Sequence, residues 1–461
     1  MKKKILHIIV GLGNGGAENT LYKLTKKLKN NFDFTILVLS KESSLKWKFK
    51  KEKINVIQLN SKNKFFFVFK FFKIYNIIKK ANPDLIQSWM YHSDFFGSIA
   101  NYTTTLKKHF RGYKEHISFC SKTFYKDSLE AIRIHSKSID EIIKFSYIET
   151  DEFEINNTNK AEANFIIKEL EHRVKEENYE TVGVITPFTD QQRLISELVA
   201  KHPERDTLYD KLRLKIMTFD SCQGEERETI YYSTVATSSK DKLNTIFPSS
   251  PCRDKDLDED TDRRCQRLNV GFSRVQECMH FVLSKEPNDF NNEIGNAIRH
   301  FHNLVEKEKE LPSESELDPN SPMEKNTLQW IKQSNFYISN PEFIQVKAQF
   351  KLGEYLRQLN PLYSHPKYKV DFLLIYNDGK KKKQIIIEYD GLEYHFNNLE
   401  EINEFNFEQY YTQEHYEREK TLESYGYEFI RLNRFNTADD PVKYLDQKFS
   451  EILNLRLKKK A

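Results

Sequence analysis

Short apolar runs alternate with helical patterns over the first ninety residues, and this alternation constrains the fold more than any other feature of the chain. The run Ile5–Val10 is mostly apolar and β-branched, glycines follow it, and leucines 21, 24 and 28 then recur at helical spacing. Further strand patterns occupy 32–40, 54–60 and 83–89, and a helix is expected near 65–80. Strands that alternate with helices form a parallel sheet covered by helices, so we predict an α/β fold.

The glycine-rich turn at 11–16 has the outer spacing of a phosphate-binding P-loop but not its chemistry. A P-loop places Lys and then Ser or Thr at its end, to meet the β- and γ-phosphates and magnesium. Here Ala17 and Glu18 follow, and Gly-Lys-Ser/Thr occurs nowhere in the chain. Because a glutamate would repel phosphate, the turn is expected to serve folding rather than ATP binding.

Two stretches of this region, "HIIVGLGNGGAENTLYKL" at 7–24 and "PDLIQSWMYHSDFFGSIA" at 83–100, resemble the start of GT-B glycosyltransferases of the family-four type. The resemblance implies a partial Rossmann-like half-domain, the acceptor side of that fold, at 1–103. The family's nucleotide-sugar domain, with its paired glutamates on a helix, has no counterpart downstream. Sugar transfer takes place between the two domains, so this fragment is expected to be inert. A glycosyltransferase fragment is kept as an alternative function.

After a break in the pattern near 100–105, a second set of motifs follows in order. It consists of "LKKHFRGYKEHISFC" at 106–120, "VGVITPFTDQQRLISELV" at 182–199, "KIMTFDSCQGEERETIYYSTV" at 215–235 and "RLNVGFSR" at 267–274. Together these stretches resemble the second RecA-like domain of superfamily-one helicases. The resemblance predicts a RecA-like parallel-sheet domain over residues 104–300.

In that family an aromatic–arginine pair lies near adenine and the γ-phosphate, and a loop after a strand senses nucleotide and nucleic acid. Later arginines reach the γ-phosphate across a cleft. The resemblance implies nucleotide-binding roles for Phe110, Arg111, Gln223, Gly224, Glu225, Arg267 and Arg274. The stretch that carries the last two arginines is interpreted as a strand.

Such arginines stabilise the charge that grows on the departing γ-phosphate. They work only opposite a P-loop and a magnesium-binding acid, and both belong to the first RecA-like domain, which this chain lacks. ATP is therefore expected to bind only with a complementing first RecA-like domain, a helicase half supplied in trans. We interpret the chain as a fusion of two truncated genes, natural or introduced by sequence assembly.

Composition adds three expectations. The net charge of +4 permits nucleic-acid binding without arguing for it. Five cysteines without CxxC or zinc spacing are typical of reduced thiols in a cytoplasmic protein. The most apolar run, 65–78, is interrupted by Lys70 and Lys73, so no membrane span is predicted.

An acidic loop precedes the arginine stretch, with aspartates at 254, 256 and 258 that alternate as in a calcium-binding loop. The glycine required at the sixth position is Glu259, and the twelfth position is Cys265 rather than Glu. We therefore predict a solvated loop without calcium.

The segment 301–320 is charged and contains Pro and Ser, which predicts a linker before a C-terminal domain at 321–461. A helix is expected after Ser321-Pro322 and another around 410–425. Strand patterns occupy 344–353, 368–376, 384–391 and 427–435, with a basic hairpin turn at Lys380–Lys383.

Three carboxylates mark the two middle strands of this domain. Glu388 and Asp390 are two residues apart, so their side chains are expected on one face, and Asp371 on the paired strand can join them. Such acids repel one another unless a cation lies between them, and oxygen ligands suit Mg²⁺ or Mn²⁺. A metal held there can activate water and stabilise charge on a phosphodiester.

The domain resembles the PD-(D/E)xK nuclease superfamily, a restriction-endonuclease-like α/β fold, in its very-short-patch-repair-like branch. The resemblance implies metal ligands at Asp371, Glu388 and Asp390, although Asp390 replaces the usual lysine. It implies catalytic roles for Glu324, Asp371, Glu388, Asp390 and Lys420. His395 matches a polar position near the site, and His415 stands where relatives often have Asp.

The sequence thus predicts a nucleic-acid-processing protein: a helicase remnant without its own P-loop that carries a metal-dependent endonuclease. DNA is the expected partner, with RNA as the alternative, and Arg431 and Arg434 are candidate phosphate contacts. A non-catalytic DNA-binding helicase remnant is the other function left open.

Overall fold

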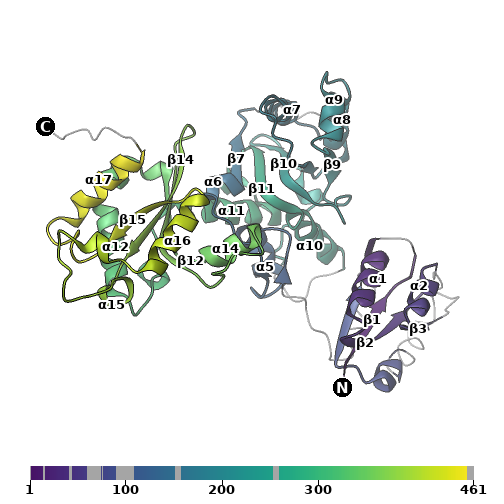
Figure 1. The fold of residues 1–461 in the computed structure, drawn as a ribbon. Coiled ribbons are helices and arrows are strands. Elements are labelled where there is room, and N and C mark those ends of the chain that lie inside the picture. The colour runs from purple at the N-terminus through teal and green to yellow at the C-terminus, as the bar shows by residue number, and fades with distance from the viewer. Residues whose placement is uncertain are drawn as a thin grey trace. The chain divides into compact units, whose positions relative to one another are not determined.

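The computed structural model describes residues 2–13, 16–40, 44–59, 74, 76–89, 108–150, 157–252 and 259–453. The chain divides into two compact units, Met1–Lys107 and Lys108–Ala461 (Figure 1). The predicted acidic loop with Asp254, Asp256 and Asp258 and the predicted break near 100–105 lie outside the described residues, as does most of the apolar run 65–78. Among the helices described, none combines the length and apolar character that a membrane crossing needs.

The N-terminal unit contains a parallel sheet in the order β3-β2-β1-β4. Its strands are β1 (Lys3–Ile9), β2 (Phe32–Val38), β3 (Asn55–Gln58) and β4 (Leu85–Trp89), with helices α1 (Gly16–Leu28) and α2 (Lys46–Lys51). Alternate residues of each strand pack on opposite faces: Phe34 and Ile36 belong to one apolar cluster, and Leu37 belongs to the other. The predicted α/β sheet is confirmed, and helix α2, which buries Phe49 alone, was not predicted.

The first part of the second unit, residues 108–309, is called here the five-stranded part. Its parallel sheet has the order β7-β11-β10-β8-β9. The strands are β7 (Ile143–Tyr147), β8 (Val182–Thr186), β9 (Lys215–Thr218), β10 (Arg227–Thr237) and β11 (Val275–Ser284). The helices are α5 (Lys114–Phe124), α6 (Ile139–Ile142), α7 (Lys160–Lys175), α8 (Thr189–Ala200), α9 (Arg205–Asp210), α10 (Glu259–Phe272) and α11 (Glu293–Lys309), and β5 (Lys108–His109) pairs with β6 (Glu130–Ala131).

Two apolar clusters cover the faces of this sheet. One joins it to α5, α10 and α11, and the other to α7, α8 and α9. Helices on both faces of a parallel sheet are the arrangement that its continuously buried strands require. Helix α11 continues to Lys309, so the first half of the predicted linker 301–320 is helical.

The arginine stretch corrects one prediction. Arg267 lies on helix α10 rather than on a strand, and Arg274 lies just before strand β11. The stretch combines a helical pattern with an apolar strand pattern. Its first part forms a helix, in which Leu268 and Phe272 lie four residues apart and are both fully buried.

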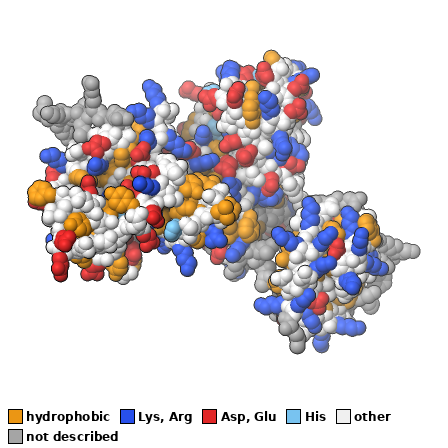
Figure 2. Space-filling view, in the orientation of Figure 1, with side chains coloured by type: hydrophobic (Ala, Val, Ile, Leu, Met, Phe, Trp, Pro, Cys, Tyr) orange, Lys and Arg blue, Asp and Glu red, His pale blue; other side chains and the backbone are white. Residues whose placement is uncertain are grey.

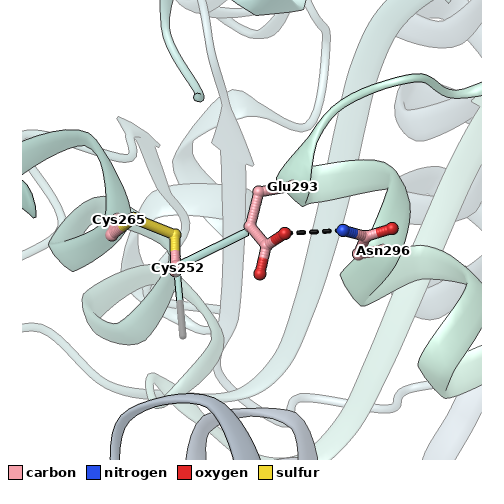
Figure 3. The surroundings of a disulfide bond; sticks show 4 residues. All are labelled: Cys252, Cys265, Glu293 and Asn296. Carbon is pink, nitrogen blue, oxygen red and sulfur yellow. Dashed lines mark hydrogen bonds between the residues drawn. A yellow bond between two sulfur atoms is a disulfide. The ribbon is translucent and has the colours of Figure 1, made fainter. Parts of the chain in front are cut away.

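The cysteines correct another. Cys252 and Cys265 form a disulfide, so the prediction of five reduced thiols is wrong for this pair (Figure 3). The free cysteines 120, 222 and 278 are buried. The two cysteines are 13 positions apart and form no motif, so the sequence does not indicate this bond. In the fold their Cα atoms lie 5.6 Å apart, a distance that allows a disulfide.

The remaining residues, 310–453, are called the C-terminal part. Their sheet has the order β12-β13-β14-β15, antiparallel except for the parallel pair β14–β15. The strands are β12 (Ile344–Phe350), β13 (Val370–Asn377), β14 (Lys382–Tyr389) and β15 (Glu428–Leu432). The helices are α12 (Pro322–Gln333), α13 (Asn335–Ser339), α14 (Leu352–Leu359), α15 (Leu392–His395), α16 (Gln413–Ser424) and α17 (Pro441–Leu453).

Helices α12 and α17 pack on one face of this sheet, and α14 and α16 pack on the other (Figure 1). The predicted strands are present, although the first ends at Phe350 because helix α14 begins at Leu352. The fold is therefore α/β in all three sheets. The basic turn is a hairpin tip, as expected, and its residue Lys382 pairs with Glu141 at 2.6 Å.

The five-stranded and C-terminal parts share direct hydrogen bonds within the second unit. The amide of Ile139 donates to Gln345 at 2.8 Å, and the ammonium of Lys347 donates to the carbonyl of Lys137 at 3.0 Å. Gln358 on α14 binds the backbone on both sides of Arg133, accepting from Ile134 and donating to Ile132. These bonds join the edge strand β12 and helix α14 to the segment before α6.

Candidate functional site

The predicted carboxylates come together where β13 and β14 pair. Phe372 pairs with Ile387 in the antiparallel register, which sets Asp371 opposite Glu388. The amide of Tyr389 donates to the Asp371 carboxylate at 3.1 Å. The sheet therefore brings Asp371 and Glu388 to one place through backbone pairing, without help from a loop.

Arg431 joins the second and third carboxylates. Strand β15 runs parallel to β14 with Arg431 in register with Glu388. Its Nη1 contacts Glu388 at 2.5 Å and Asp390 at 3.0 Å, and its Nε contacts Glu419 at 2.8 Å. Arg431 was expected to contact phosphate, but its side chain is directed into the carboxylates.

Burial perturbs two of these acids. Burial, together with the nearby Glu388 carboxylate, raises the pKa of Asp371 to about 7. Burial also raises the pKa of Asp390 to about 7, although Arg431 acts in the opposite direction. The charged form of each of these two acids is therefore unfavourable at this position. A bound cation would stabilise both carboxylates.

Helix α16 contributes Arg418 rather than the predicted Lys420. Arg418 lies 3.6 Å from Glu388 and packs over the ring of Tyr368, whose hydroxyl also donates to Glu388. Lys420 is exposed on the same helix, and its side chain makes no hydrogen bond or ion pair within the described residues. Helical spacing explains the difference, because Arg418 shares the inward face with buried His415 and Leu422.

Glu324 on helix α12 is buried, as a residue of the site would be. It accepts hydrogen bonds from the amide of Asp318 at 2.9 Å and from the side chain of Gln349 at 3.1 Å. Its charge also contributes to the raised pKa of Asp371. Glu324 therefore lies near the carboxylates, at the end of the sheet where α12 begins.

Two histidines border Asp390 on its other side. His395 Nδ1 lies 3.4 Å from the Asp390 carboxylate and 3.3 Å from His415 Nδ1. Tyr411 donates to the second oxygen of Asp390 at 3.1 Å and stacks on the ring of His415. Burial, with Arg431 and Arg418 nearby, lowers the pKa of His415 to about 3, so its imidazole is neutral.

The predicted nucleotide-binding arginines lie at the surface of the five-stranded part. Arg111 contacts Glu226 at 2.5 Å and donates to the carbonyl of Ser273. Burial and the charge of Arg111 lower the pKa of Arg274, whose Nε donates to the carbonyl of Val270 at 2.7 Å. Phe110, next to Arg111 in sequence, is 68% exposed, so most of this ring faces solvent.

The other four predicted residues form a neighbouring group. Gln223 and Gly224 are exposed, and the positive φ of Gly224, 84°, shows a turn that favours glycine. Glu225 pairs with Lys215 at 2.6 Å, which lowers its pKa. Arg267 pairs with Asp220 at 2.6 Å. On the face drawn in Figure 2, Lys and Arg of the second unit are interspersed with Asp and Glu rather than gathered into one basic area.

Comparison with known proteins covers part of the chain. Residues 90–286 match the family model described as an AAA domain. The match overlaps the stretch predicted as the second RecA-like domain and supports a helicase-like, nucleotide-binding domain there. No curated protein matches the chain.

Two of the similar solved structures show how distant these likenesses are. The C-terminal domain of a possible DNA helicase from Lactobacillus plantarum WCFS1 is 11% identical, over 41% of this chain and 96% of that one, with a TM-score of 0.23. A glycosyltransferase from Rickettsia africae ESF-5 is 14% identical, over 66% of this chain and 98% of that one, with a TM-score of 0.25. Likenesses at this level do not distinguish between the two functions.

Proposed function

We propose that the chain is a helicase-related protein whose C-terminal part, within the predicted domain 321–461, cleaves DNA with the help of a divalent metal ion. The observation that carries the proposal is the convergence of Asp371, Glu388 and Asp390 at the paired ends of β13 and β14. Burial, with Glu388 nearby, raises the pKa of two of these acids to about 7, so a bound cation would stabilise their charged forms.

The donor set fits Mg²⁺ or Mn²⁺. Asp371 and Glu388 offer carboxylate oxygens on adjacent strands, and the backbone carbonyl of Tyr389 directly follows Glu388 in sequence. Hard cations of this kind prefer oxygen ligands and retain water molecules. When bound, such an ion lowers the pKa of its water and stabilises the charge on a phosphodiester.

Two arginines beside the carboxylates carry donors that could bind a phosphate. Within the described residues, Arg418 Nε and Arg431 Nη2 are buried donors without a hydrogen-bond partner. Buried donors of this kind are costly unless a ligand or water satisfies them, and guanidinium groups fit phosphate oxygens. Arg418 thus takes the phosphate-binding role that the sequence assigned to Lys420, and Glu324 would orient water from helix α12.

The five-stranded part would serve a different step. Arg111 donates to the carbonyl of Ser273 and the half-buried Arg274 donates to that of Val270, so both arginines are anchored at the end of α10, where we propose that they meet a γ-phosphate held elsewhere. We propose that ATP is bound only when a first RecA-like domain is supplied in trans. A helicase remnant that binds DNA without cleaving it is the second candidate. It would be favoured if these arginines have a role and the carboxylate cluster has none.

The test is nicking of supercoiled plasmid and cutting of single-stranded DNA and RNA by the full chain with Mg²⁺. Asp371→Asn and Glu388→Gln keep volume and remove one ligand charge each. Both should lose cleavage by two or more orders of magnitude while DNA affinity changes little, because phosphate contacts carry affinity. Asp378→Asn at the hairpin tip and Glu428→Gln on β15 are matched controls outside the site and should cut as wild type.

Equal cutting by wild type and both ligand variants, or full cutting in chelator, would show that the metal site is wrong. Wild type that binds DNA without ever cutting would establish the non-catalytic remnant instead. Cutting of RNA alone would reassign the substrate while leaving the site intact.

A further inference from the structure

We propose that Asp390, His395 and His415 form a second binding site, for a transition-metal ion of the zinc class, which adjoins the oxygen site of Asp371 and Glu388 and takes Asp390 from the same carboxylate cluster. The three residues each direct one donor atom to a common point, and these atoms lie within 4.8 Å of one another. The proposal does not depend on DNA cleavage, because it concerns ligand type and geometry alone.

The distances suit a tetrahedral ion. Zinc bonds of about 2.1 Å place neighbouring ligands of a tetrahedron about 3.4 Å apart. His395 Nδ1 lies 3.4 Å from Asp390 Oδ1 and 3.3 Å from His415 Nδ1. Imidazole nitrogen also distinguishes this site from its neighbour, since zinc-class ions prefer nitrogen ligands and Mg²⁺ prefers oxygen.

The other nitrogen of His415 gives an independent indication. His415 is buried, and among the described residues its Nε2 has no hydrogen-bond partner. The nearest acid is Glu419, whose oxygen lies 3.8 Å away, and Glu419 is held by Arg431 at 2.8 Å. A histidine that ligates zinc usually donates its second N–H to a carboxylate, and a shift of under about 1 Å would form that bond here.

The two imidazoles are held in place by the surrounding structure. The amide of Thr412 donates to the carbonyl of His395 at 3.0 Å, which ties the end of α15 to the start of α16. The ring of Tyr411 is stacked between those of Phe396 and His415. Fixed donors lose little freedom on binding an ion, so preorganisation favours metal over a solvated pair of histidines.

Arg431 is the feature that opposes a cation, and the geometry accommodates it. Its Nη1 donates to Asp390 Oδ1, the oxygen that also faces His395. A carboxylate oxygen has two lone pairs, so it can accept this bond and still ligate an ion. Glu388 and Glu419 share the remaining charge of Arg431.

Co²⁺ titration of the metal-free full chain in excess Mg²⁺ tests the proposal, because Mg²⁺ fills oxygen sites and Co²⁺ absorbs visibly in low-coordinate nitrogen sites. Wild type should bind one Co²⁺, displaced by one Zn²⁺. His395→Asn and His415→Asn should each weaken Zn²⁺ binding at least about tenfold. His172→Asn, an exposed histidine on α7, is the matched control and should bind as wild type.

Asp371→Asn separates this site from the nuclease: it should abolish cleavage and leave the Co²⁺ absorption unchanged. X-ray absorption of the zinc-loaded wild type requires no variant and should show histidine ligands. The proposal is overturned if wild type binds neither ion in Mg²⁺, if zinc shows oxygen ligands only, or if both histidine variants that fold bind as wild type. In each of these results the two histidines are simply hydrogen-bonded to each other.

Discussion

The carboxylate cluster of the C-terminal part and the arginine group of the five-stranded part are built in opposite ways. In the first, Glu388 and Asp390 are 6% and 1% exposed, and one arginine contacts three acids. In the second, Arg111 and Arg267 lie at the surface, and each pairs with one exposed acid. The first cluster is enclosed by its own sheet and helices, whereas the second faces solvent.

This difference is the one expected if the first site is complete on its own fold and the second is half of an interface. Enclosed charges have to be matched inside the protein, because water cannot solvate them. Exposed arginines are solvated and can exchange partners at little cost. The enclosed site is therefore expected to be sensitive to every change, and the open group to respond only when a second domain is present.

The largest expected effect is at the centre of the enclosed site. Arg431→Met leaves Glu388 and Asp390 buried without their shared cation, and breaking such a pair costs about 3–5 kcal/mol. Urea denaturation of the full chain with Trp47 and Trp89 replaced by Phe, followed by the fluorescence of Trp330, should show an early transition in the C-terminal part.

Arg434→Met, at an exposed position on the same segment, is the control and should denature as wild type. If Arg431→Met and Arg434→Met unfold at the same urea concentration, the ion pairs do not stabilise the enclosed site, and the two sites do not differ in this respect.

A second prediction sharpens the contrast, because the five-stranded part has one enclosed acid of its own. Glu162 on α7 is fully buried, accepts hydrogen bonds from Ser233, Val235 and Ser284, and has a pKa raised by burial to about 7. Its raised pKa favours the protonated folded state, so its contribution is present below about pH 4.5 and is lost as pH rises through about 7.

The loss amounts to about 3 kcal/mol at most, since one pKa unit corresponds to about 1.4 kcal/mol. Urea denaturation of wild type and Glu162→Gln between pH 5 and 8 measures it. As pH rises from 5 to 8, the free energy of unfolding of wild type should fall relative to that of Glu162→Gln, whichever of the two proteins is more stable at pH 5. Parallel pH profiles for the two proteins would show that Glu162 does not titrate in this range.

A smaller effect is expected at the open group. Arg111→Met removes an ion pair whose two side chains are 31% and 49% exposed, and such pairs contribute about 0–1 kcal/mol. A double-mutant cycle with Glu226→Gln should give a coupling in that range, screened by salt. A coupling of several kcal/mol would mean that the group is enclosed in solution.

The smallest expected effect is none. The chain lacks a Walker A lysine, so the purified protein should not hydrolyse ATP with or without DNA, and Arg274→Ala should leave this background unchanged. DNA-stimulated hydrolysis that Arg274→Ala abolishes would show that the open group is a complete site after all.

The sequence predicted the sheets well, because burial on both faces leaves continuous apolar runs such as 182–186 and 385–387. It also predicted that Glu388 and Asp390 would share a face, since strand geometry alone determines this relation. What it predicted poorly depends on contacts distant in sequence. The disulfide of Cys265 with Cys252 and the pairing of Arg431 with Glu388 both follow from how segments return to one another.

Helix α16 shows what helical periodicity adds to a motif resemblance. The resemblance implies a role for Lys420, which is exposed and lies off the face defined by His415 and Leu422. Arg418 lies on that face and reaches Glu388. Cys265 and Leu268, three positions apart and both buried, indicate a helix around Arg267 in the same way, although a strand was predicted there.

The hydrogen bonds between Ile139 and Gln345 and between Lys137 and Lys347 determine how much of this chain can be transplanted. A cut at residue 320 would remove the partners of both side chains of strand β12 and expose to water the apolar surface of the C-terminal part against which Ile134 packs. The smallest portable piece therefore starts upstream of residue 137 rather than at 321. Genetic exchange that moves the C-terminal sheet between proteins would have to carry part of the five-stranded part along with it.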